Sequence, residues 1–256
     1  KIELAERLKA IAPGNLDISI FGMSGSDAVE AALKTAAIAT GRSGVIAFTG
    51  GYHGLSYGAL EVTGYKNSFK RPFRGQMGRF SSHLSYPNTY RFAVGDSASD
   101  CGLASLDTIR EALDHPANGL DDIGAVIVEP IQGRGGVVVP PDGWLDGLIA
   151  VCRERDILVI FDEIFTGLGR TGDWFVADRL KEVPDLLCLG KALAGGFPLS
   201  VVLGTPEVMG AWGLSSGEAI HTSTFLGNPL GCSMALASLN VIEEEGYLAR
   251  ARQLGQ

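Results

Sequence analysis

The sequence predicts an α/β protein in which helices cover both faces of a mostly parallel β-sheet, giving three layers. Short apolar runs rich in branched residues, typical of strands buried on both faces of a sheet, alternate with helical stretches of ten or more residues. This alternation is typical of βαβ units, whose strands are parallel. No linker or repeat interrupts the pattern, so we expect one domain over residues 1–256.

The expected elements follow the chain in order. An amphipathic helix starts within residues 1–7, and a long helix opens at Ser24 and ends at Gly41, a plausible C-terminal cap. Further helices are expected at 103–113, 143–155 and 229–245. Strands are expected at 17–21, 44–48, 123–128, 157–161, 185–189 and 200–203. Residues 66–94 lack periodicity and contain two prolines, so we expect a long ordered loop there.

Composition excludes several classes of function. The net charge of −8 and the lack of a basic run argue against a nucleic-acid surface. No apolar run reaches the roughly 18 residues of a membrane helix, and the N-terminal stretch does not resemble a signal peptide. The cysteines are far apart, which suggests neither a disulfide framework nor a zinc site, and the histidines form no metal pattern. We therefore expect a cytoplasmic protein without a metal.

Polar residues follow several predicted strands. Asp162 ends the strand at 157–161, Lys191 follows the strand at 185–189, and Glu129 follows the strand at 123–128. In open α/β sheets, ligands bind beyond the carboxyl ends of the strands. Glu129 could be only a solvated strand end, although the glycines after it favour a ligand. The chain has 35 glycines, about twice the usual ~7%, and they cluster after strands, where backbone approaches ligands closely.

The turn at residues 24–27 (Ser-Gly-Ser-Asp) opens the first long helix after a strand. Free backbone N–H groups and the helix dipole make such a turn a potential phosphate site. The alternative is an ordinary N-cap at this turn, with Glu30 completing a capping box.

Two other motifs resemble nucleotide-binding sequences, but the residues around them do not fit such a site. Residues 167–172 match the dinucleotide fingerprint, but five residues separate them from the preceding strand, and they do not open a helix. The pair Gly190 and Lys191 lacks the glycine and the hydroxyl residue of a phosphate loop.

Asp162 and Lys191 together suggest a particular chemistry. A lysine at a strand end can lose its proton and attack an aldehyde, and a buried aspartate needs a partner. Pyridoxal 5'-phosphate satisfies both residues, because its aldehyde condenses with the lysine and its ring nitrogen pairs with the aspartate. Its phosphate would occupy the turn at 24–27, and Tyr52 could stack on its ring. A structural ion pair between Asp162 and Lys191 remains the alternative.

Six motifs, in the same order, resemble the class III (ω-amino acid) aminotransferases, which belong to the fold type I pyridoxal-phosphate enzymes. They are residues 24–30 (SGSDAVE), 52–54 (YHG), 129–133 (EPIQG), 162–172 (DEIFTGLGRTG), 190–198 (GKALAGGFP) and 224–229 (TFLGNP). The resemblance implies a large cofactor domain with one antiparallel strand, expected at 200–203.

The resemblance also implies the roles of individual residues. Lys191 would hold the cofactor as a Schiff base and carry a proton, and Asp162 would pair with the ring nitrogen; these two are the expected catalytic residues. The other expected cofactor-binding residues are Gly25 and Ser26 at the phosphate, Tyr52 and Ile164 on the two ring faces, His53 and Glu129 near the cofactor, and Thr224 at the phosphate of a neighbouring subunit. The last role implies a homodimer with shared sites.

The sequence departs from the family at two site positions and in length. Many members have a glutamine where Phe165 stands and a glutamate where Arg134 stands. A cation at Arg134 suggests the hypothesis that it meets a substrate carboxylate. The family's N-terminal segment and C-terminal small domain are expected to be absent, so that residues 1–256 form the large domain alone.

The implied function is the transfer of an amino group from an amino acid or amine to a 2-oxo acid or aldehyde. The expected partners are therefore small molecules, with neither nucleic acid nor membrane. Two alternatives remain open. One is another pyridoxal-phosphate reaction of the same fold, by an aminomutase, racemase or decarboxylase. The other is a truncated domain without catalysis.

Overall fold

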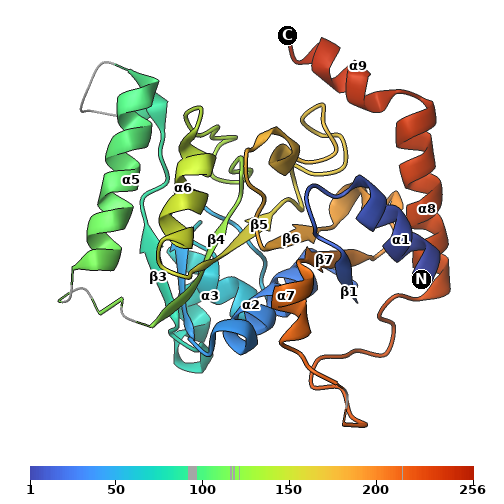
Figure 1. The fold of residues 1–256 in the computed structure, drawn as a ribbon, viewed down its shortest axis with the longest axis horizontal. Coiled ribbons are helices and arrows are strands. Elements are labelled where there is room, and N and C mark those ends of the chain that lie inside the picture. The colour runs from blue at the N-terminus through green and yellow to red at the C-terminus, as the bar shows by residue number, and fades with distance from the viewer. Residues whose placement is uncertain (92–96, 116, 118, 121, 215) are drawn as a thin grey trace.

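The computed structural model describes residues 1–91, 97–115, 117, 119–120, 122–214 and 216–256. Its centre is a seven-stranded sheet with helices on both sides (Figure 1). The strands, in their order across the sheet, are β1 (Ile18–Gly22), β7 (Ser200–Gly204), β6 (Leu186–Leu189), β5 (Leu158–Asp162), β4 (Ile123–Val128), β2 (Gly44–Phe48) and β3 (Ser81–Leu84). The helices are α1 (Ile2–Ile11), α2 (Gly25–Thr40), α3 (Tyr57–Val62), α4 (Asn67–Lys70), α5 (Ala98–Asp114), α6 (Trp144–Arg153), α7 (Pro206–Gly210), α8 (Pro229–Glu244) and α9 (Tyr247–Leu254).

The sheet has one strand of opposite direction. Strand β7 is antiparallel to both of its neighbours, β1 and β6, whereas the remaining paired strands are parallel. This confirms the mostly parallel sheet and the antiparallel strand predicted at 200–203. It also means that β1, β2, β4, β5 and β6 all end at the same edge of the sheet.

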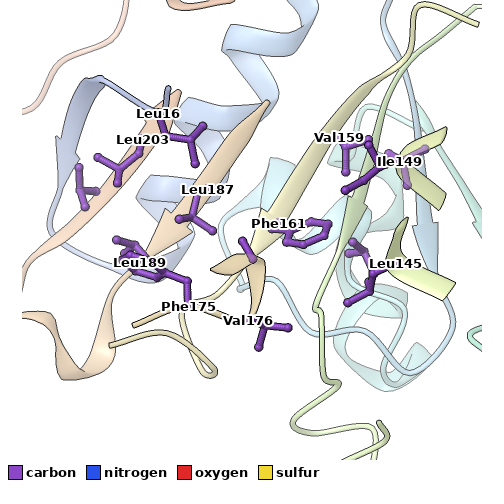
Figure 2. Close-up of a cluster of buried hydrophobic side chains, with 14 of the residues drawn as sticks. Leu16, Leu145, Ile149, Val159, Phe161, Phe175, Val176, Leu187, Leu189 and Leu203 are labelled. Atoms are coloured by element: carbon purple, nitrogen blue, oxygen red, sulfur yellow. The ribbon is translucent and has the colours of Figure 1, made fainter. Parts of the chain in front are cut away.

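The two faces of the sheet form two hydrophobic cores, as the three-layer prediction requires. Successive residues of β5 alternate between them: Val159 and Phe161 face one core, and Ile160 faces the other. The first core includes apolar residues of α1, α5, α6 and α8, and the second includes those of α2, α3 and α7. Figure 2 shows Phe161 in the first core with Leu145, Val176 and Leu187 around it. Asp162, the next residue of β5, is thus carried on a strand that both cores hold in place.

The start of α2 corrects one sequence-based expectation. Ser24 is the N-cap, and the backbone N–H of Asp27 donates to its Oγ (3.2 Å), while the backbone N–H of Ser24 donates to Asp27 Oδ2 (3.0 Å). The capping box is therefore closed by Asp27, and the expectation that Glu30 closes it is wrong. A capping box joins the N-cap to the third residue after it, and Glu30 lies beyond that position. Gly41 ends the helix in the left-handed conformation, as predicted.

The loop expected at 66–94 is the second correction. It contains α4, the 3₁₀ helix η1 (Arg71–Gln76) and strand β3, which pairs in parallel with β2. Strand β3 lies at the edge of the sheet, and its residues are only partly buried. Its composition of two serines, a histidine and a leucine therefore gives no apolar run to detect. Residues 92–94 of this range lie outside the described residues.

The five predicted helices are present as α1, α2, α5, α6 and α8, with differences at their ends, whereas α3, α7 and α9 were not predicted. Helix α5 begins earlier than expected because the N–H of Asp100 donates to the side chain of Ser97, its N-cap (3.2 Å). The four cysteines are buried free thiols. In the described part of the chain, no helix is long and apolar enough to span a membrane.

Candidate active site

A cavity of about 500 Å³ opens where the carboxyl ends of five strands meet. Its volume lies within the usual range of small-molecule sites. It brings together all but one of the residues that the sequence analysis singled out for the cofactor. The lining residues are Ser24, Gly25, Ser26, Tyr52, His53, Gly54, Glu129, Gly133, Arg134, Asp162, Ile164, Phe165 and Lys191.

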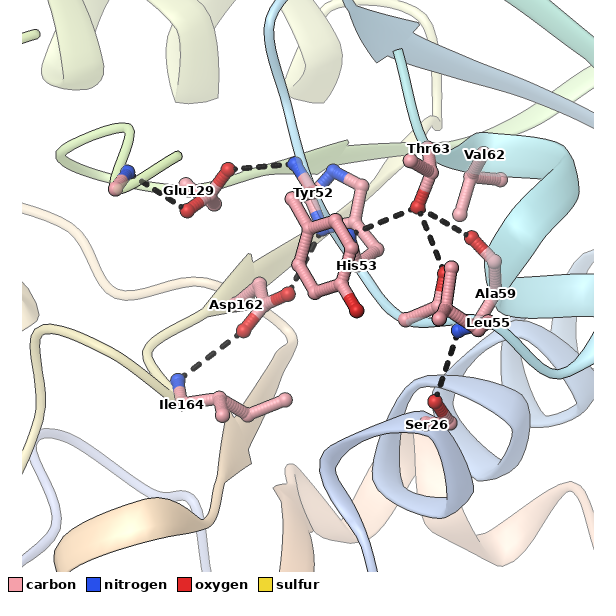
Figure 3. Close-up of polar contacts among 12 residues, drawn as sticks. Ser26, Tyr52, His53, Leu55, Ala59, Val62, Thr63, Glu129, Asp162 and Ile164 are labelled. Atoms are coloured by element: carbon pink, nitrogen blue, oxygen red, sulfur yellow. Dashed lines mark hydrogen bonds and ion pairs between the residues drawn. The ribbon is translucent and has the colours of Figure 1, made fainter. Parts of the chain in front are cut away.

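Asp162 is fixed at the last position of β5 by two contacts. Its Oδ2 lies 2.8 Å from Nδ1 of His53, and its Oδ1 accepts the backbone N–H of Ile164 (3.1 Å). Figure 3 shows the two contacts. The side chains of Asp162 and His53 are both buried. A buried carboxylate is stable only when paired or hydrogen-bonded, and here the partner is a histidine rather than a lysine. The alternative of an Asp162–Lys191 ion pair is not realised among the described residues.

His53 is itself positioned by the segment between β2 and α3. Its backbone N–H donates to Oγ1 of Thr63 (3.0 Å), whose hydroxyl lies within hydrogen-bond distance of the carbonyl oxygen of Ala59 (2.9 Å). Thr63 follows α3 and is buried. It was not identified from the sequence, because a single threonine outside any motif carries no signal.

Glu129 follows β4 and joins two loops of the site. Its Oε1 accepts the backbone N–H of Tyr52 (2.7 Å), and its Oε2 accepts that of Gly133 (3.0 Å) (Figure 3). Burial, followed by the nearby charge of Asp162, raises the pKa of the Glu129 carboxyl, and the two backbone donors oppose that rise. Glu129 is therefore a buried structural acceptor at the cavity wall rather than a solvated strand end.

The N-terminus of α2 faces the cavity with unused donors. Within the described residues, the backbone N–H groups of Gly25 and Ser26 have no acceptor, since the capping box serves Ser24 and Asp27. A side chain at Gly25 would meet Ile164 Cδ1 at 2.9 Å, so glycine keeps the approach to this end open. Ser26 Oγ accepts the N–H of Leu55 (3.2 Å), which leaves its hydroxyl hydrogen able to donate. The turn thus caps α2 and also leaves donors available to an anion.

Lys191 follows β6 after Gly190 and begins the 3₁₀ helix η5 (Lys191–Ala194). Its φ of +36° is unusual for a residue with a side chain, and such strain is concentrated at functional sites. Its Nζ lies 5.8 Å from the centroid of the Phe165 ring. In the described part of the chain this ammonium makes no ion pair. The lysine is therefore held by its backbone and left free at its tip.

Phe165 and Arg134 complete the mouth of the cavity. The Phe165 ring leaves little room at Gly133, where an added Cβ would lie 3.1 Å from Phe165 Cδ1. The guanidinium carbon of Arg134 lies 4.2 Å from the centroid of the Tyr52 ring, a cation–π contact.

Thr224 is the expected site residue that does not line this cavity. It is exposed, in the turn before α8. The cavity is also lined by residues that were not expected to bind the cofactor, among them Gly54, Gly133 and Phe165. Gly54 and Gly133 are the last residues of the motifs at 52–54 and 129–133, which gave a signal for them in the sequence. Among the described residues, no group of three or more histidine, cysteine, aspartate or glutamate side chains is arranged to hold a metal.

Comparison with known proteins gives a consistent result. A family model described as aminotransferase class-III matches residues 1–256. An (S)-enantioselective ω-transaminase from Thermomicrobium roseum is similar to 97% of this chain, with 32% identity and a TM-score of 0.90, over 56% of its own length. The ω-transaminase of Pseudomonas jessenii in complex with PMP is similar to the whole chain, with 33% identity and a TM-score of 0.91, over 58% of its own length. The chain thus spans little more than half the length of these solved structures.

Proposed function

Because this chain belongs to the class III aminotransferases, whose cofactor is pyridoxal phosphate, we propose that it transfers amino groups through this cofactor held in the cavity at the sheet edge. The donor would be an amino acid or amine, and the acceptor a 2-oxo acid or aldehyde. The observation that carries the proposal is the placement of Asp162 and Lys191 in one cavity, each at the end of a core strand. The structure of a relative in complex with PMP supports the same cofactor.

The chemistry of the lining residues fits pyridoxal phosphate. The free N–H groups of Gly25 and Ser26 at the start of α2 match a phosphate, which helix N-termini favour. Asp162 accepts one donor at each oxygen and keeps lone pairs for a protonated ring nitrogen. Tyr52 and Ile164 supply an aromatic and an aliphatic surface for the two ring faces. When bound, the cofactor supplies an aldehyde for condensation with amines and a ring that accepts the electron pair released at the substrate carbon.

The residues of this chain would then divide the remaining work. Asp162 keeps the ring nitrogen charged, and the buried His53 holds Asp162 in position. Lys191 Nζ, as a free amine, would take the proton from the substrate carbon that bears the amino group and pass it to the former aldehyde carbon of the cofactor. Its exposed side chain, which makes no ion pair within the described residues, suits a proton carrier. Glu129 fixes the Tyr52 and Gly133 backbones, and thereby the shape of the cavity around the substrate.

The proposal extends to the assembly. Thr224 lies outside the cavity of its own chain, and its neighbour Phe225 and also Ile220 expose 61% and 76% of their surface. An exposed apolar segment beside a predicted phosphate ligand is consistent with a second copy of the chain, whose site Thr224 would complete. Residues 1–256 would form the cofactor domain of such a dimer, and the buried free thiols suit a reducing cytoplasm.

The experiment that tests the function starts with addition of pyridoxal phosphate to the purified chain. We expect a visible absorption band, and we expect borohydride reduction followed by peptide mass spectrometry to place the cofactor on Lys191. A Lys191→Ala variant should carry no adduct. A preparation without a band or label would refute the proposal.

A second measurement separates transamination from the other pyridoxal-phosphate reactions. An amino donor alone, 4-aminobutanoate or butylamine, should convert the bound cofactor to its amine form and release one carbonyl product per site. Release of carbon dioxide, or inversion of an added chiral amino acid without this conversion, would instead indicate a decarboxylase or a racemase.

A further inference from the structure

Arg134 lies at the tip of a turn whose base is fixed. Gln132 and Val138 exchange two backbone hydrogen bonds of 3.0 Å, and the Gln132 side chain donates to the carbonyl oxygen of Thr49 (2.9 Å). At the start of the turn, the N–H of Gly133 is held by Glu129. The backbone that carries Arg134 is therefore tied to β4 and to the residue after β2, although its side chain is exposed.

The Arg134 guanidinium contacts the aromatic ring of Tyr52 rather than an acidic side chain. The guanidinium carbon lies over the Tyr52 ring, 4.2 Å from the centroid, and both residues line the cavity. Within the described part of the chain, Arg134 forms no ion pair and no hydrogen bond. Its N–H groups are therefore available as donors to a ligand in the cavity.

The acids of the cavity are not available to Arg134. Asp162 is engaged by His53 and Ile164, and both oxygens of Glu129 accept backbone N–H groups. Lys191 is the other cation that lines the cavity, and the proposed function commits it to the cofactor. Among the described residues that line the cavity, Arg134 is therefore the cation whose donors remain available to an entering anion.

We infer that Arg134 binds the carboxylate of the substrate, and that the enzyme prefers amino donors and oxo acceptors that carry a carboxylate over neutral amines. The inference rests on the proposed function, because it concerns the substrate of the same cavity. A planar guanidinium binds a carboxylate through two parallel hydrogen bonds, which fixes the orientation of the substrate as well as its charge. Arg134 is then a specificity-determining residue, and it takes no part in the proton transfer.

The kinetic test compares two donors that differ only in the carboxylate, 4-aminobutanoate and butylamine. For Arg134→Gln in the holoenzyme, we expect kcat/KM to fall about 10- to 100-fold with 4-aminobutanoate and to stay within about twofold with butylamine. Arg134→Lys should restore part of the loss, since it keeps the charge without the planar fork. The control is Arg110→Gln, a residue of α5 that lies outside the cavity and pairs with Asp107 of the same helix, which should change neither value.

A second measurement does not depend on turnover. Phenylglyoxal should modify Arg134 in the wild-type chain, and glutarate, a dicarboxylate without an amino group, should slow that modification while leaving Arg110 unaffected. Equal losses with both donors, no loss with either, or no protection by glutarate would overturn the inference. If the wild-type protein converts neither donor, the proposed function fails, and the protection measurement still decides whether Arg134 binds carboxylates.

Discussion

His53 Nδ1 lies 2.8 Å from Asp162 Oδ2, and both side chains are buried beneath the candidate cavity. The pair joins the segment after β2 to the end of β5, two elements separated in the sheet by β4. The Nε2 atom of His53 is buried and has no hydrogen-bond partner among the described residues. Burial of this unsatisfied nitrogen destabilises the folded protein, and the hydrogen bond to Asp162 offsets that cost.

The first prediction concerns this pair. A His53→Leu variant leaves Asp162 Oδ2 without its donor, and we expect the free energy of unfolding to fall by about 1–3 kcal/mol. The same substitution removes the unsatisfied Nε2 atom, which is stabilising, so the net decrease should lie near the lower end of this range. The affinity for pyridoxal phosphate should fall as well, by about tenfold or more, because the carboxylate is no longer held in position. Urea unfolding and cofactor titration measure the two effects.

The matched variant is His53→Asn, whose side-chain amide can reach the position of Nδ1 and donate to Asp162 in its place. We expect it to recover much of both losses. Equal behaviour of the leucine and asparagine variants would show that the ring matters by its volume and not by its hydrogen bond.

The second prediction concerns Gly54, which lies between the proposed phosphate turn and α3. Its φ of +130° is rarely adopted by residues with a side chain, and an added Cβ would collide with Ser26 Oγ and approach Ala59 Cβ at 3.1 Å. Gly54→Ala should therefore destabilise the fold by about 3 kcal/mol through strain and displacement of Ser26.

Gly41→Ala is the control for backbone strain alone. Gly41 also has a positive φ, of +67°, but nothing lies within 4 Å of an added Cβ. We expect this variant to cost about 1 kcal/mol and to leave cofactor affinity unchanged. A Gly54→Ala variant that is as stable as Gly41→Ala, with normal cofactor affinity, would contradict the close packing around Ser26.

The sequence predicts the frame of this site better than its internal contacts. Asp162 and Lys191 were located because each ends an apolar run, and the carboxyl ends of parallel strands must meet at one edge. The contact of Asp162 with His53 was not foreseen, since nothing in the spacing tells which side chain a buried carboxylate selects. Strand β3 escaped detection for a related reason: its pairing with β2 comes from the edge of the sheet and not from an apolar pattern of its own.

Glu30 shows why a local motif can mislead. A glutamate in the first turns of a helix suggests a cap for that helix, yet its partners lie on another one. Glu30 Oε1 accepts the N–H groups of Gly58 (2.8 Å) and Ala59 (3.2 Å) at the start of α3. Only the packing of α2 against α3 brings these groups together, and no sequence window contains them both.

The third prediction tests this assignment. Glu30→Ala should remove the acceptor at the start of α3 and raise amide hydrogen exchange at Gly58 and Ala59 about fivefold, since a lost cap costs about 1 kcal/mol. Exchange at Asp27, inside the capping box of α2, should not change. The reciprocal variant, Asp27→Ala, should raise exchange at Ser24 and leave α3 protected. Faster exchange at Asp27 in the Glu30 variant would instead support the sequence-based prediction that Glu30 completes the capping box of α2.

The fourth prediction concerns Glu163, a fully buried carboxyl next to Asp162. It accepts the backbone N–H groups of Val176 (2.8 Å) and Ala177 (3.0 Å) and the hydroxyl of Thr166 (2.9 Å), and so holds the 3₁₀ helix η4 (Val176–Arg179). Burial raises its pKa from 4.5 to about 7, and the charge of Asp178 adds to the rise, whereas the three donors oppose it.

The sign of the pH effect follows from this rise. The folded protein binds the Glu163 proton more tightly than the unfolded chain, so stability is greatest at low pH and falls as pH rises from about 4.5 to about 7. The loss contributed by this group is at most about 3 kcal/mol, at about 1.4 kcal/mol per pKa unit. Above about pH 7 both states are ionised, and the contribution no longer changes with pH.

Glu163→Gln cannot ionise and should remove this contribution. The pKa values of other carboxyls, such as Asp185 and Asp178, are also raised by burial. The quantity to measure is therefore the difference in unfolding free energy between wild type and variant. At pH 5 the wild type should have its largest advantage, because the neutral acid satisfies its partners without a charge. By pH 8 that advantage should shrink by up to about 3 kcal/mol. A difference that stays constant from pH 5 to pH 8 in urea unfolding would show that Glu163 is ionised in the folded protein throughout.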